Sequence, residues 1–330
     1  MNKIIILVFI SFILSHAHLE ANLYKKFQKF ISKYNKKYSS AEEYFARYQN
    51  FVKNYLELES MEERPYKTGI TKFFDLSHQE ISNNYLNFDY RKLPFNLTPL
   101  KLKSSNEDAP DSYDWRDYIS MPMKDQGSCG AGWSFSTMQM LETLYIKETG
   151  TYVSFSQQML IDCVTENSGC NGGYIEYALE WIMNNGIMKE SDYPYTGMKG
   201  PCKSSSARYI DMKVTGYSKL GEASPIYGPA DEDEMKILLY QKGPYSVGIN
   251  SSQLYMYRSG ILDVSSTICP PTEINHQVLL VGYGTANGVD YWILKNSWGS
   301  SWGEKGYFRV ARGKSVCGVN YYAIVADVSF

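Results

Sequence analysis

One histidine and one asparagine in the C-terminal third are the first candidates for chemistry. His276 is the only histidine after residue 108, and Asn287-Gly288 is a strong hairpin signal between two strand-like runs. Counting back from this turn places His276 opposite Gly299, three residues beyond Asn296, a difference that a β-bulge can absorb. A lone histidine is more often structural. Here the neighbouring strand brings an amide that can orient the imidazole, so the pattern favours a general base.

A second candidate stretch is Gln126 to Ser136, which reads QGSCGAGWSFS and opens a helical run ending at Gly150. It resembles the active-site segment of the papain family of cysteine proteases, in which a Gln is followed by Cys-Gly-Ser/Ala-Cys-Trp. Asn296-Ser297-Trp298-Gly299 likewise matches the Asn-Ser-Trp-Gly of that family. The resemblance implies that His276 is the base, that Asn296 orients it, and that the Gln126 side chain donates to an oxyanion.

The resemblance fails at the reacting atom. Gly132 stands where the family has its nucleophilic cysteine. A thiol at a helix N-terminus has a lowered pKa because the free N–H groups favour the thiolate. Glycine offers neither thiolate nor alkoxide, although its N–H can still serve as the second oxyanion donor. Three nearby residues are poor substitutes: Cys129 in an implied disulfide, Ser134 on another side of the helix, and Ser128 before it.

Three functional hypotheses follow. The first is a papain-like protease homologue, made as a proenzyme, that is inactive because of Gly132 and retains a peptide-binding cleft. The second is a working cysteine endopeptidase whose nucleophile was replaced in this version of the chain. The third is activity through an unorthodox nucleophile. The sequence therefore leaves open whether this member of a cysteine-type endopeptidase family is an active enzyme.

The resemblance also implies a peptide-binding surface. Cys170-Asn171-Gly172-Gly173-Tyr174 predicts a tight turn at which an extended substrate backbone pairs, and a purely structural turn is the alternative. Tyr174 and Ile175 would border the main specificity pocket. By the same resemblance that pocket takes an apolar or aromatic side chain, and its remaining residues are Gly248, Gln277 and Tyr322. The resemblance also implies that Trp298 shields the hydrogen bond between Asn296 and His276.

The elements that position these residues divide the chain into three parts. Residues 1–21 combine Lys3, an apolar run and small residues suited to cleavage, which predicts a secretory signal peptide; a buried N-terminal helix is the alternative. Residues 22–108 form a pro-region that ends in a polar, proline-punctuated linker. Residues 109–330 form the peptidase-like domain. We expect an α+β fold with a helical lobe, a β-barrel lobe and a cleft between them.

The pro-region reads as two amphipathic helices within residues 22–62. Spacings there match the interrupted motif of papain-family propeptides at Glu43, Arg47, Phe51, Asn54 and Leu58, with Glu62 where Asn is usual. The short motif that follows has Gly69, Phe73 and Asp75, with Thr71 where Asn is usual. The resemblance therefore implies an inhibitory propeptide, with processing near 108–109.

Six cysteines all lie after residue 108, and six allow fifteen pairings. The resemblance implies Cys129–Cys170, Cys163–Cys202 and Cys269–Cys317, which leaves no thiol free. Disulfides and a leader favour a secretory, lysosome-like or extracellular location. A net charge of −2 gives no reason to expect nucleic acid, and no stretch is long enough to span a membrane. We expect a monomer without metal or cofactor whose partners are peptides and its own propeptide. Asn96 and Asn250 fit the glycosylation pattern.

Overall fold

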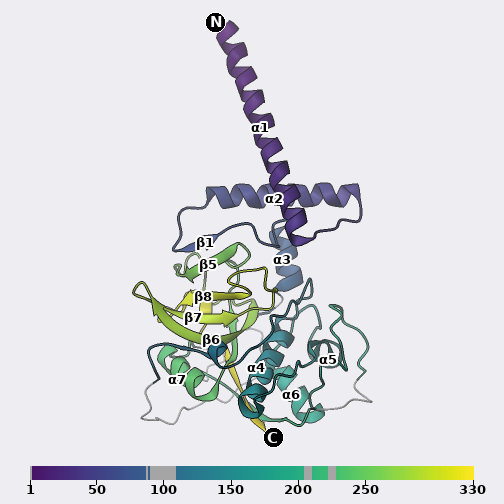
Figure 1. Ribbon diagram of the computed structural model, residues 1–330, viewed down its shortest axis with the longest axis vertical. Coiled ribbons are helices and arrows are strands. Elements are labelled where there is room, and N and C mark those ends of the chain that lie inside the picture. The colour runs from purple at the N-terminus through teal and green to yellow at the C-terminus, as the bar shows by residue number, and fades with distance from the viewer. Residues whose placement is uncertain (1, 87, 90–108, 204–209, 222–227) are drawn as a thin grey trace.

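A computed structural model describes residues 2–86, 88–89, 109–203, 210–221 and 228–330; the linker and Asn96 lie outside these ranges. The pro-region sits at one end of the molecule, where α1 (Asn2–Tyr34) and α2 (Ala41–Ser60) cross and α3 (His78–Tyr85) leads toward the rest (Figure 1). No helix among the described residues is long and apolar enough to cross a bilayer. The leader continues into α1, and its cleavage remains a prediction.

Local chemistry explains the pro-region helices. Ser40 caps α2 by accepting the N–H of Glu43 at 3.1 Å, and acidic side chains in the first turn suit the positive end of the helix. A reciprocal capping box between Ser77 and Glu80 starts α3. The crossing of α1 and α2 is filled by buried phenylalanines 27, 30 and 51. The two predicted helices are confirmed.

The helical lobe is built around α4 (Gly132–Thr149), which packs against α5 (Gln157–Cys163) and α6 (Ile175–Asn185). Most of α4 is buried, and it ends where Gly150 adopts the left-handed conformation at φ 69°. Its first residue is Gly132, as the sequence predicted. Figure 1 shows these helices gathered on one side of the sheet.

The sheet has the order β1-β5-β8-β7-β6-β4-β9-β3, with β2 pairing β6. Its strands are β1 (Tyr66–Thr68), β2 (Tyr113–Asp114), β3 (Lys213–Lys219), β4 (Tyr245–Ile249), β5 (Tyr257–Leu262), β6 (His276–Ala286), β7 (Val289–Lys295), β8 (Tyr307–Ala311) and β9 (Ala323–Ser329). Helix α7 (Glu232–Lys242) and the 3-10 turns η2 (Trp115–Asp117) and η4 (Val316–Gly318) complete the chain. Strand β1 belongs to the pro-region, so the pro-region extends the sheet.

The β6–β7 hairpin confirms the predicted turn. Asn287 and Gly288 both have positive φ, at 52° and 75°. Pairing runs from Ala286↔Val289 to Gly282↔Ile293 and then shifts by one residue at a bulge. This bulge supplies part of the slack that the His276–Asn296 pairing needs.

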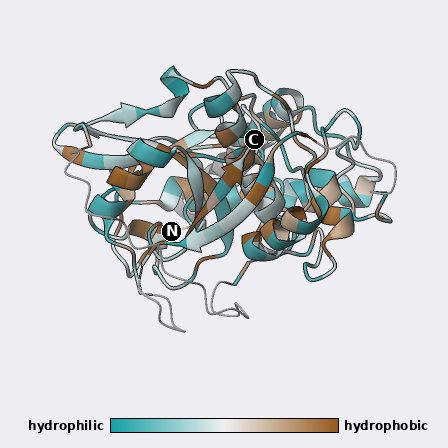
Figure 2. Cartoon of the chain, turned by 90° about the horizontal axis from the view of Figure 1, so that it is seen from below, coloured by the Kyte–Doolittle hydropathy of each residue, from teal (hydrophilic) through white to brown (hydrophobic). Residues whose placement is uncertain are grey.

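One continuous core joins α4 to β6, and hydrophobic segments gather between helices and sheet (Figure 2). The α+β prediction is confirmed. The structure contains the three disulfides Cys129–Cys170, Cys163–Cys202 and Cys269–Cys317, the pairing that the resemblance implied. Glycosylation of Asn250 is contradicted: its side chain is 1% exposed and donates to the Pro270 carbonyl at 3.0 Å.

Candidate active site

His276 and Asn296 meet as predicted. His276 begins β6 and Asn296 directly follows β7, and Nε2 of the imidazole lies 2.9 Å from Oδ1 of Asn296. The same oxygen accepts the backbone N–H of Ser297 at 2.8 Å, which fixes it as the acceptor. Nε2 therefore carries the proton, and Nδ1 keeps a free lone pair on the other side of the ring.

The imidazole of His276 is buried and neutral. Trp298, fully buried, stacks on the ring with centroids 5.0 Å apart and an interplanar angle of 21°. Burial lowers the pKa of His276 to about 4, and the hydrogen bond that the imidazole donates to Asn296 opposes that shift only in part. Without an anion beside it, this histidine stays uncharged at neutral pH.

Position 132 faces the free nitrogen of this ring. A Cβ built on Gly132 would lie 2.8 Å from both Nδ1 and Cε1 of His276. A side chain at 132 would therefore point at the base, which is where a nucleophile must be. The ring has taken part of that volume, so any side chain there requires the imidazole to move by several tenths of an ångström.

Gln126 lies beside the same centre. Its Oε1 accepts the hydroxyl of Ser297 at 2.6 Å, and its Nε2 donates to the carbonyl of Cys129 at 2.8 Å. Nε2 also lies 3.4 Å from the carbonyl oxygen of Tyr85, a pro-region residue. Helix α4 has no side-chain cap; Ser134 and Phe135 donate their N–H groups to the Ala131 carbonyl at 2.9 and 3.1 Å, which leaves those of Gly132 and Trp133 as the candidate oxyanion donors.

The nearby hydroxyl and thiol groups are already engaged. Ser134 is fully buried and donates to the Gln157 carbonyl at 2.8 Å. Cys129 is bonded to Cys170. Neither group faces His276 as position 132 does, so the geometry brings the His276 imidazole, the Asn296 amide bonded to it and the Gln126 amide together around a residue without a side chain.

Comparison with known proteins identifies the family of this chain. The profile of the papain family cysteine proteases matches residues 109–326, and that of the cathepsin propeptide inhibitor domain matches residues 27–81. The chain belongs to the papain family of cysteine proteases. A cathepsin L-like proteinase of Fasciola hepatica is 37% identical over 297 residues, covering 87% of this chain and 88% of the relative. Cysteine proteinase 15A of Pisum sativum is 35% identical, with coverages of 89% and 84%.

Solved proenzymes of the papain family share the whole architecture. Digestive procathepsin L 3 of Tenebrio molitor superimposes with a TM-score of 0.80 at 33% identity, covering 92% of this chain and 98% of the other. A recombinant stem bromelain precursor gives a TM-score of 0.80 at 30% identity, with coverages of 92% and 98%. The chain is therefore a papain-family proenzyme in form, with a papain-like α+β fold and a helical propeptide.

The turn for which peptide binding is predicted is shaped by close packing. Gly172 has φ 106°, and a Cβ on Gly173 would lie 2.5 Å from Asn167 and 2.8 Å from Trp133. Gln277 donates to the Gly173 carbonyl at 3.1 Å, which ties β6 to this turn. The structure thus places the predicted turn beside the histidine strand.

Among the predicted pocket residues, Gly248 lies directly against the ring of Tyr322, because a Cβ at 248 would lie 3.1 Å from it. Ile175 and Tyr322 are fully buried, and the Tyr174 hydroxyl donates to the Asp89 carbonyl at 3.2 Å. Two further residues were not predicted: Phe88 and Glu176. Phe88 lies outside the propeptide motifs, and Glu176 reads from the sequence as an ordinary acid in the first turn of a helix.

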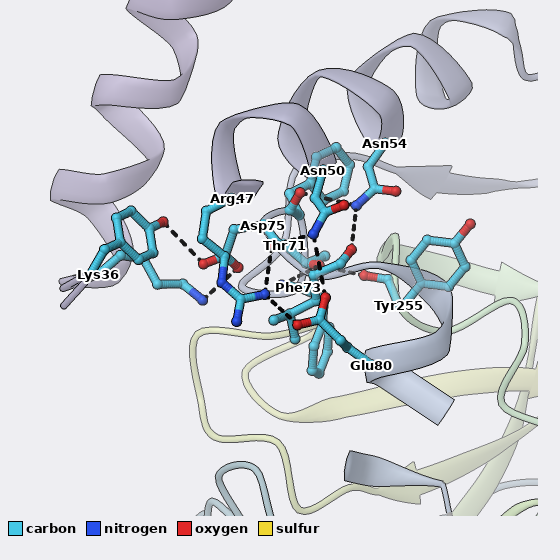
Figure 3. Close-up of polar contacts among 12 residues, drawn as sticks. Lys36, Arg47, Asn50, Asn54, Thr71, Phe73, Asp75, Glu80 and Tyr255 are labelled. Atoms are coloured by element: carbon cyan, nitrogen blue, oxygen red, sulfur yellow. Dashed lines mark hydrogen bonds and ion pairs between the residues drawn. The ribbon is translucent and has the colours of Figure 1, made fainter. Parts of the chain in front are cut away.

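A polar cluster in the pro-region, here called the pro-region latch, holds its segments together (Figure 3). Arg47 of α2 donates to Glu80 of α3 at 2.6 Å. Asn54 is 1% exposed and donates to the carbonyls of Phe74 and Leu76 at 3.0 and 2.8 Å. We define the latch by its five motif or capping residues: Arg47, Asn54, Thr71, Asp75 and Glu80.

The latch also reaches the peptidase-like domain. The Thr71 hydroxyl donates to the Tyr255 carbonyl (Figure 3). Nearby, Gly69 donates its N–H to the Met256 carbonyl at 2.9 Å. Asp75 is held by Lys36 at 2.7 Å on the pro-region side. Backbone and side chain thus both fix residues 69–75 against the peptidase-like domain.

Phe73 packs the pro-region segment 69–75 against the candidate active site. Its ring is fully buried and meets the rings of Trp298 and Tyr85 edge to face, each with centroids 5.0 Å apart. Next to it, Lys72 pairs with Asp125 at 2.8 Å, one residue before Gln126. The pro-region therefore covers Trp298, the residue that stacks on His276.

Proposed function

We propose that this chain is a papain-family proenzyme homologue whose peptidase-like domain binds extended peptides but does not cleave them. One observation supports this above all: position 132 faces the free Nδ1 of His276, and glycine offers no atom there to attack a peptide. Loss of a triad nucleophile lowers kcat on the order of 10⁶ in a serine protease, and only residual catalysis is left.

The remaining groups support retention of peptide binding. The Gln126 amide is held by Ser297, and the glycine-rich turn is held by Gln277. Neither hydrogen bond depends on a side chain at 132. The groups that would bind a carbonyl and an extended backbone are therefore independent of the group that would cut it.

A second candidate is an active endopeptidase whose natural chain has cysteine at 132. The neutral Nδ1 of His276 and the intact hydrogen bond to Asn296 favour it, because both are the arrangement a thiol would use. Sequencing codon 132 from independent genomic copies separates the two candidates: cysteine there supports the second, and glycine in every copy supports the first.

The direct experiment compares three processed chains on a fluorogenic peptide: the unchanged chain, Gly132→Cys, and Gly132→Ala as a control that adds only the Cβ. We expect hydrolysis by the Cys variant alone. Hydrolysis by the unchanged chain would contradict the proposal, since another nucleophile would then operate. If none of the three chains hydrolysed the peptide, the site would have lost more than its nucleophile.

We propose further that the chain enters the secretory pathway and ends in a lysosome-like, vacuolar or extracellular compartment. Three disulfides and the leader-like residues 1–21 support this location. N-terminal sequencing of the native protein tests it: a chain beginning near residue 22 or residue 109 is expected, and one beginning at Met1 would contradict the location. A chain without its nucleophile cannot process itself, so a start near 109 requires another protease.

A further inference from the structure

A pocket in the helical lobe has no part in the proposed function. It encloses about 390 Å³, which lies within the range of small-ligand sites, and we call it the helical-lobe pocket. No residue of its lining belongs to the predicted catalytic or peptide-binding residues. The lining residues that decide its chemistry are Lys124, Asp125, Phe135, Gln157, Glu190 and Tyr195.

The wall of the helical-lobe pocket contains a buried amide that has no partner. Gln157 is the first residue of α5 and is 1% exposed. Its backbone carbonyl accepts the Ser134 hydroxyl at 2.8 Å. Neither Nε2 nor Oε1 of its side chain has a hydrogen-bond partner within the described part of the chain. A buried amide costs free energy while its hydrogen bonds are unmade, so a ligand that bonds to Gln157 gains affinity.

The charges around the pocket favour a cation. Among the described lining residues Lys124 is the only base, and its Nζ lies 2.6 Å from a carboxylate oxygen of the buried Glu142. This pairing balances the charge of Lys124 within the protein. Glu190 lies farther from the same Nζ, at 3.5 Å, and Asp125 is 49% exposed at its side chain. Two carboxylates at the pocket are therefore in reach of a ligand.

The pro-region already places a basic side chain on one of these carboxylates. Nζ of Lys72 lies 2.8 Å from both carboxylate oxygens of Asp125. The charge of Asp125 loses this partner when the pro-region leaves. The contact shows which kind of group Asp125 accepts, and a ligand that reaches Asp125 from the pocket has to compete with Lys72.

We infer that the helical-lobe pocket binds an arginine side chain of a partner polypeptide, and that this side chain competes with Lys72 for Asp125. A guanidinium carries five donors in one plane, which suits two carboxylates and the amide oxygen of Gln157 together. Its flat face also packs on aromatic rings, and Phe135 and Tyr195 meet edge to face with centroids 5.1 Å apart. An ammonium is a single point charge and cannot use all of these groups at once.

The helical-lobe pocket is joined to the candidate active site and to the pro-region. The Tyr195 hydroxyl donates to the Gln126 carbonyl at 2.6 Å, and Asp125 directly precedes Gln126. Lys72 directly precedes Phe73, the ring that packs on Trp298. A ligand that displaces Lys72 should therefore loosen residues 69–75. By linkage, the pro-region weakens the ligand by the same factor by which the ligand loosens the pro-region. This inference does not depend on residue 132 or on peptide cleavage.

Calorimetric titration of the full chain with small probes tests the ligand class. Nα-acetylarginine amide is compared with Nα-acetylcitrulline amide, which has nearly the same shape without the charge, and with Nα-acetyllysine amide. We expect a Kd on the order of 1 mM for the arginine probe. Binding of the citrulline probe should be at least about tenfold weaker. Equal binding of the arginine and citrulline probes overturns the inference, and equal binding of the lysine probe overturns the assignment to arginine.

Two lining residues test the place of binding. Gln157→Leu should weaken the arginine probe about tenfold, the loss of roughly one hydrogen bond, and Gln157→Glu should restore it. Glu190→Gln should weaken the probe by a similar factor, and Asp192→Asn, an exposed acid outside the lining, should not. Binding that depends on Glu190 but not on Gln157 is surface attraction only and overturns the site. So does a crystal structure in which an ordered water bonds Gln157 and saturating arginine probe leaves it in place.

A charge deletion in the pro-region tests the competition. Lys72→Met should tighten binding of the arginine probe about fivefold to tenfold, because Asp125 then has no competing cation. Lys67→Met removes an exposed charge of β1 and should leave binding unchanged. In the unchanged chain, saturating arginine probe should speed hydrogen exchange of residues 69–75 by the same factor. If Lys72→Met leaves the affinity unchanged, or the probe leaves this exchange unchanged, the competition is wrong.

Discussion

The active site and the pro-region latch both depart from the family pattern, but with opposite consequences. At the latch, Thr71 stands where asparagine is usual, and its hydroxyl still donates to a carbonyl of the peptidase-like domain. At the candidate active site, Gly132 stands where the resemblance places a cysteine, and neither Cys129, which is in a disulfide, nor Ser134, which bonds Gln157, takes its place. A group that only forms hydrogen bonds has chemical substitutes. A nucleophile at one point in space has none.

The comparison also shows that the contacts that hold His276 in place do not depend on a side chain at position 132. His276 keeps its hydrogen bond to Asn296 and its stack on Trp298 with no partner at position 132. These contacts stabilise the fold by themselves, so they persist without catalysis. The predictions below test how far this independence extends, from the largest expected effect to the smallest.

The largest effect is expected within a restored active site. In the Gly132→Cys background, His276→Ala should lower kcat on the order of 10⁶, as loss of a triad histidine does in a serine protease. Burst and steady-state kinetics on a fluorogenic peptide measure it. Retention of activity within tenfold would show that the imidazole does not act on residue 132, and the geometric assignment of the centre would be wrong.

Next in size is removal of the ring that seals the site. Phe73→Ala should weaken the packing of the pro-region by about 3 to 5 kcal/mol, because a fully buried aromatic side chain is lost from between Trp298 and Tyr85. Limited proteolysis of the full chain reports the exposed pro-region. Phe45→Ala is the control: it lies on α2 and is 58% exposed, so it should change little. If protease cleaved the Phe45 variant faster than the unchanged chain but not the Phe73 variant, Phe73 would not be the residue that holds the pro-region over the site.

The pH dependence of stability distinguishes the active site from the pocket around Tyr322. The pKa of His276 is lowered to about 4, so between its ordinary value of about 6.5 and pH 4 the unfolded chain binds a proton that the folded chain does not. Stability should therefore fall as pH falls through this window, by up to about 3 kcal/mol. The pKa of Glu176 is raised to about 7, so between pH 4.5 and 7 its contribution has the opposite sign.

Thermal unfolding from pH 4 to 7 checks these two slopes. His276→Gln should remove the loss of stability at acid pH, and Glu176→Gln should remove the loss toward neutral pH. The difference between each variant and the unchanged chain isolates one group from all others. Parallel profiles for all three chains would mean that neither buried group titrates in this range.

A smaller effect is expected from one amide of the latch. Asn54→Ala leaves the carbonyls of Phe74 and Leu76 without their donor and should cost about 1 to 3 kcal/mol. Gln49→Ala on the exposed face of α2 is the control. Hydrogen exchange of residues 71–76 measures the difference, and equal exchange in the two variants would show that Asn54 does not hold this segment.

The sequence predicted the fold and the centre of the site because those features have local signatures. The Asn287-Gly288 turn follows from two adjacent residues, whereas the helix start at Gly132 was implied by the resemblance and has no side-chain cap of its own. The position of the β6–β7 bulge does not follow from adjacent residues, since it lies at Gly282, where β6 also pairs with β2, a strand far away in the sequence. The resemblance supplied the disulfide pairing, which fifteen possibilities had left open.

Features that depend on burial could not be predicted. Residues 250–252 match the glycosylation pattern, yet the Asn250 side chain is buried and donates to the Pro270 carbonyl. Phe88 and Glu176 come from the pro-region and α6, and only the folded chain places them on two sides of Tyr322. A polar residue at the edge of an amphipathic helix gives no signal that it will be fully enclosed.

The smallest expected effect addresses Gly132 itself. Alanine at the start of a helix is favoured over glycine by at most about 1 kcal/mol. The added Cβ, however, would lie 2.8 Å from the His276 ring, which is held on its other sides by Asn296 and Trp298. Displacing a packed ring costs about 1 to 3 kcal/mol, so Gly132→Ala should destabilise the fold slightly, by about 1 kcal/mol in thermal unfolding. A stabilised variant would show that the imidazole moves aside freely, and a restored cysteine would then meet no steric opposition at this centre.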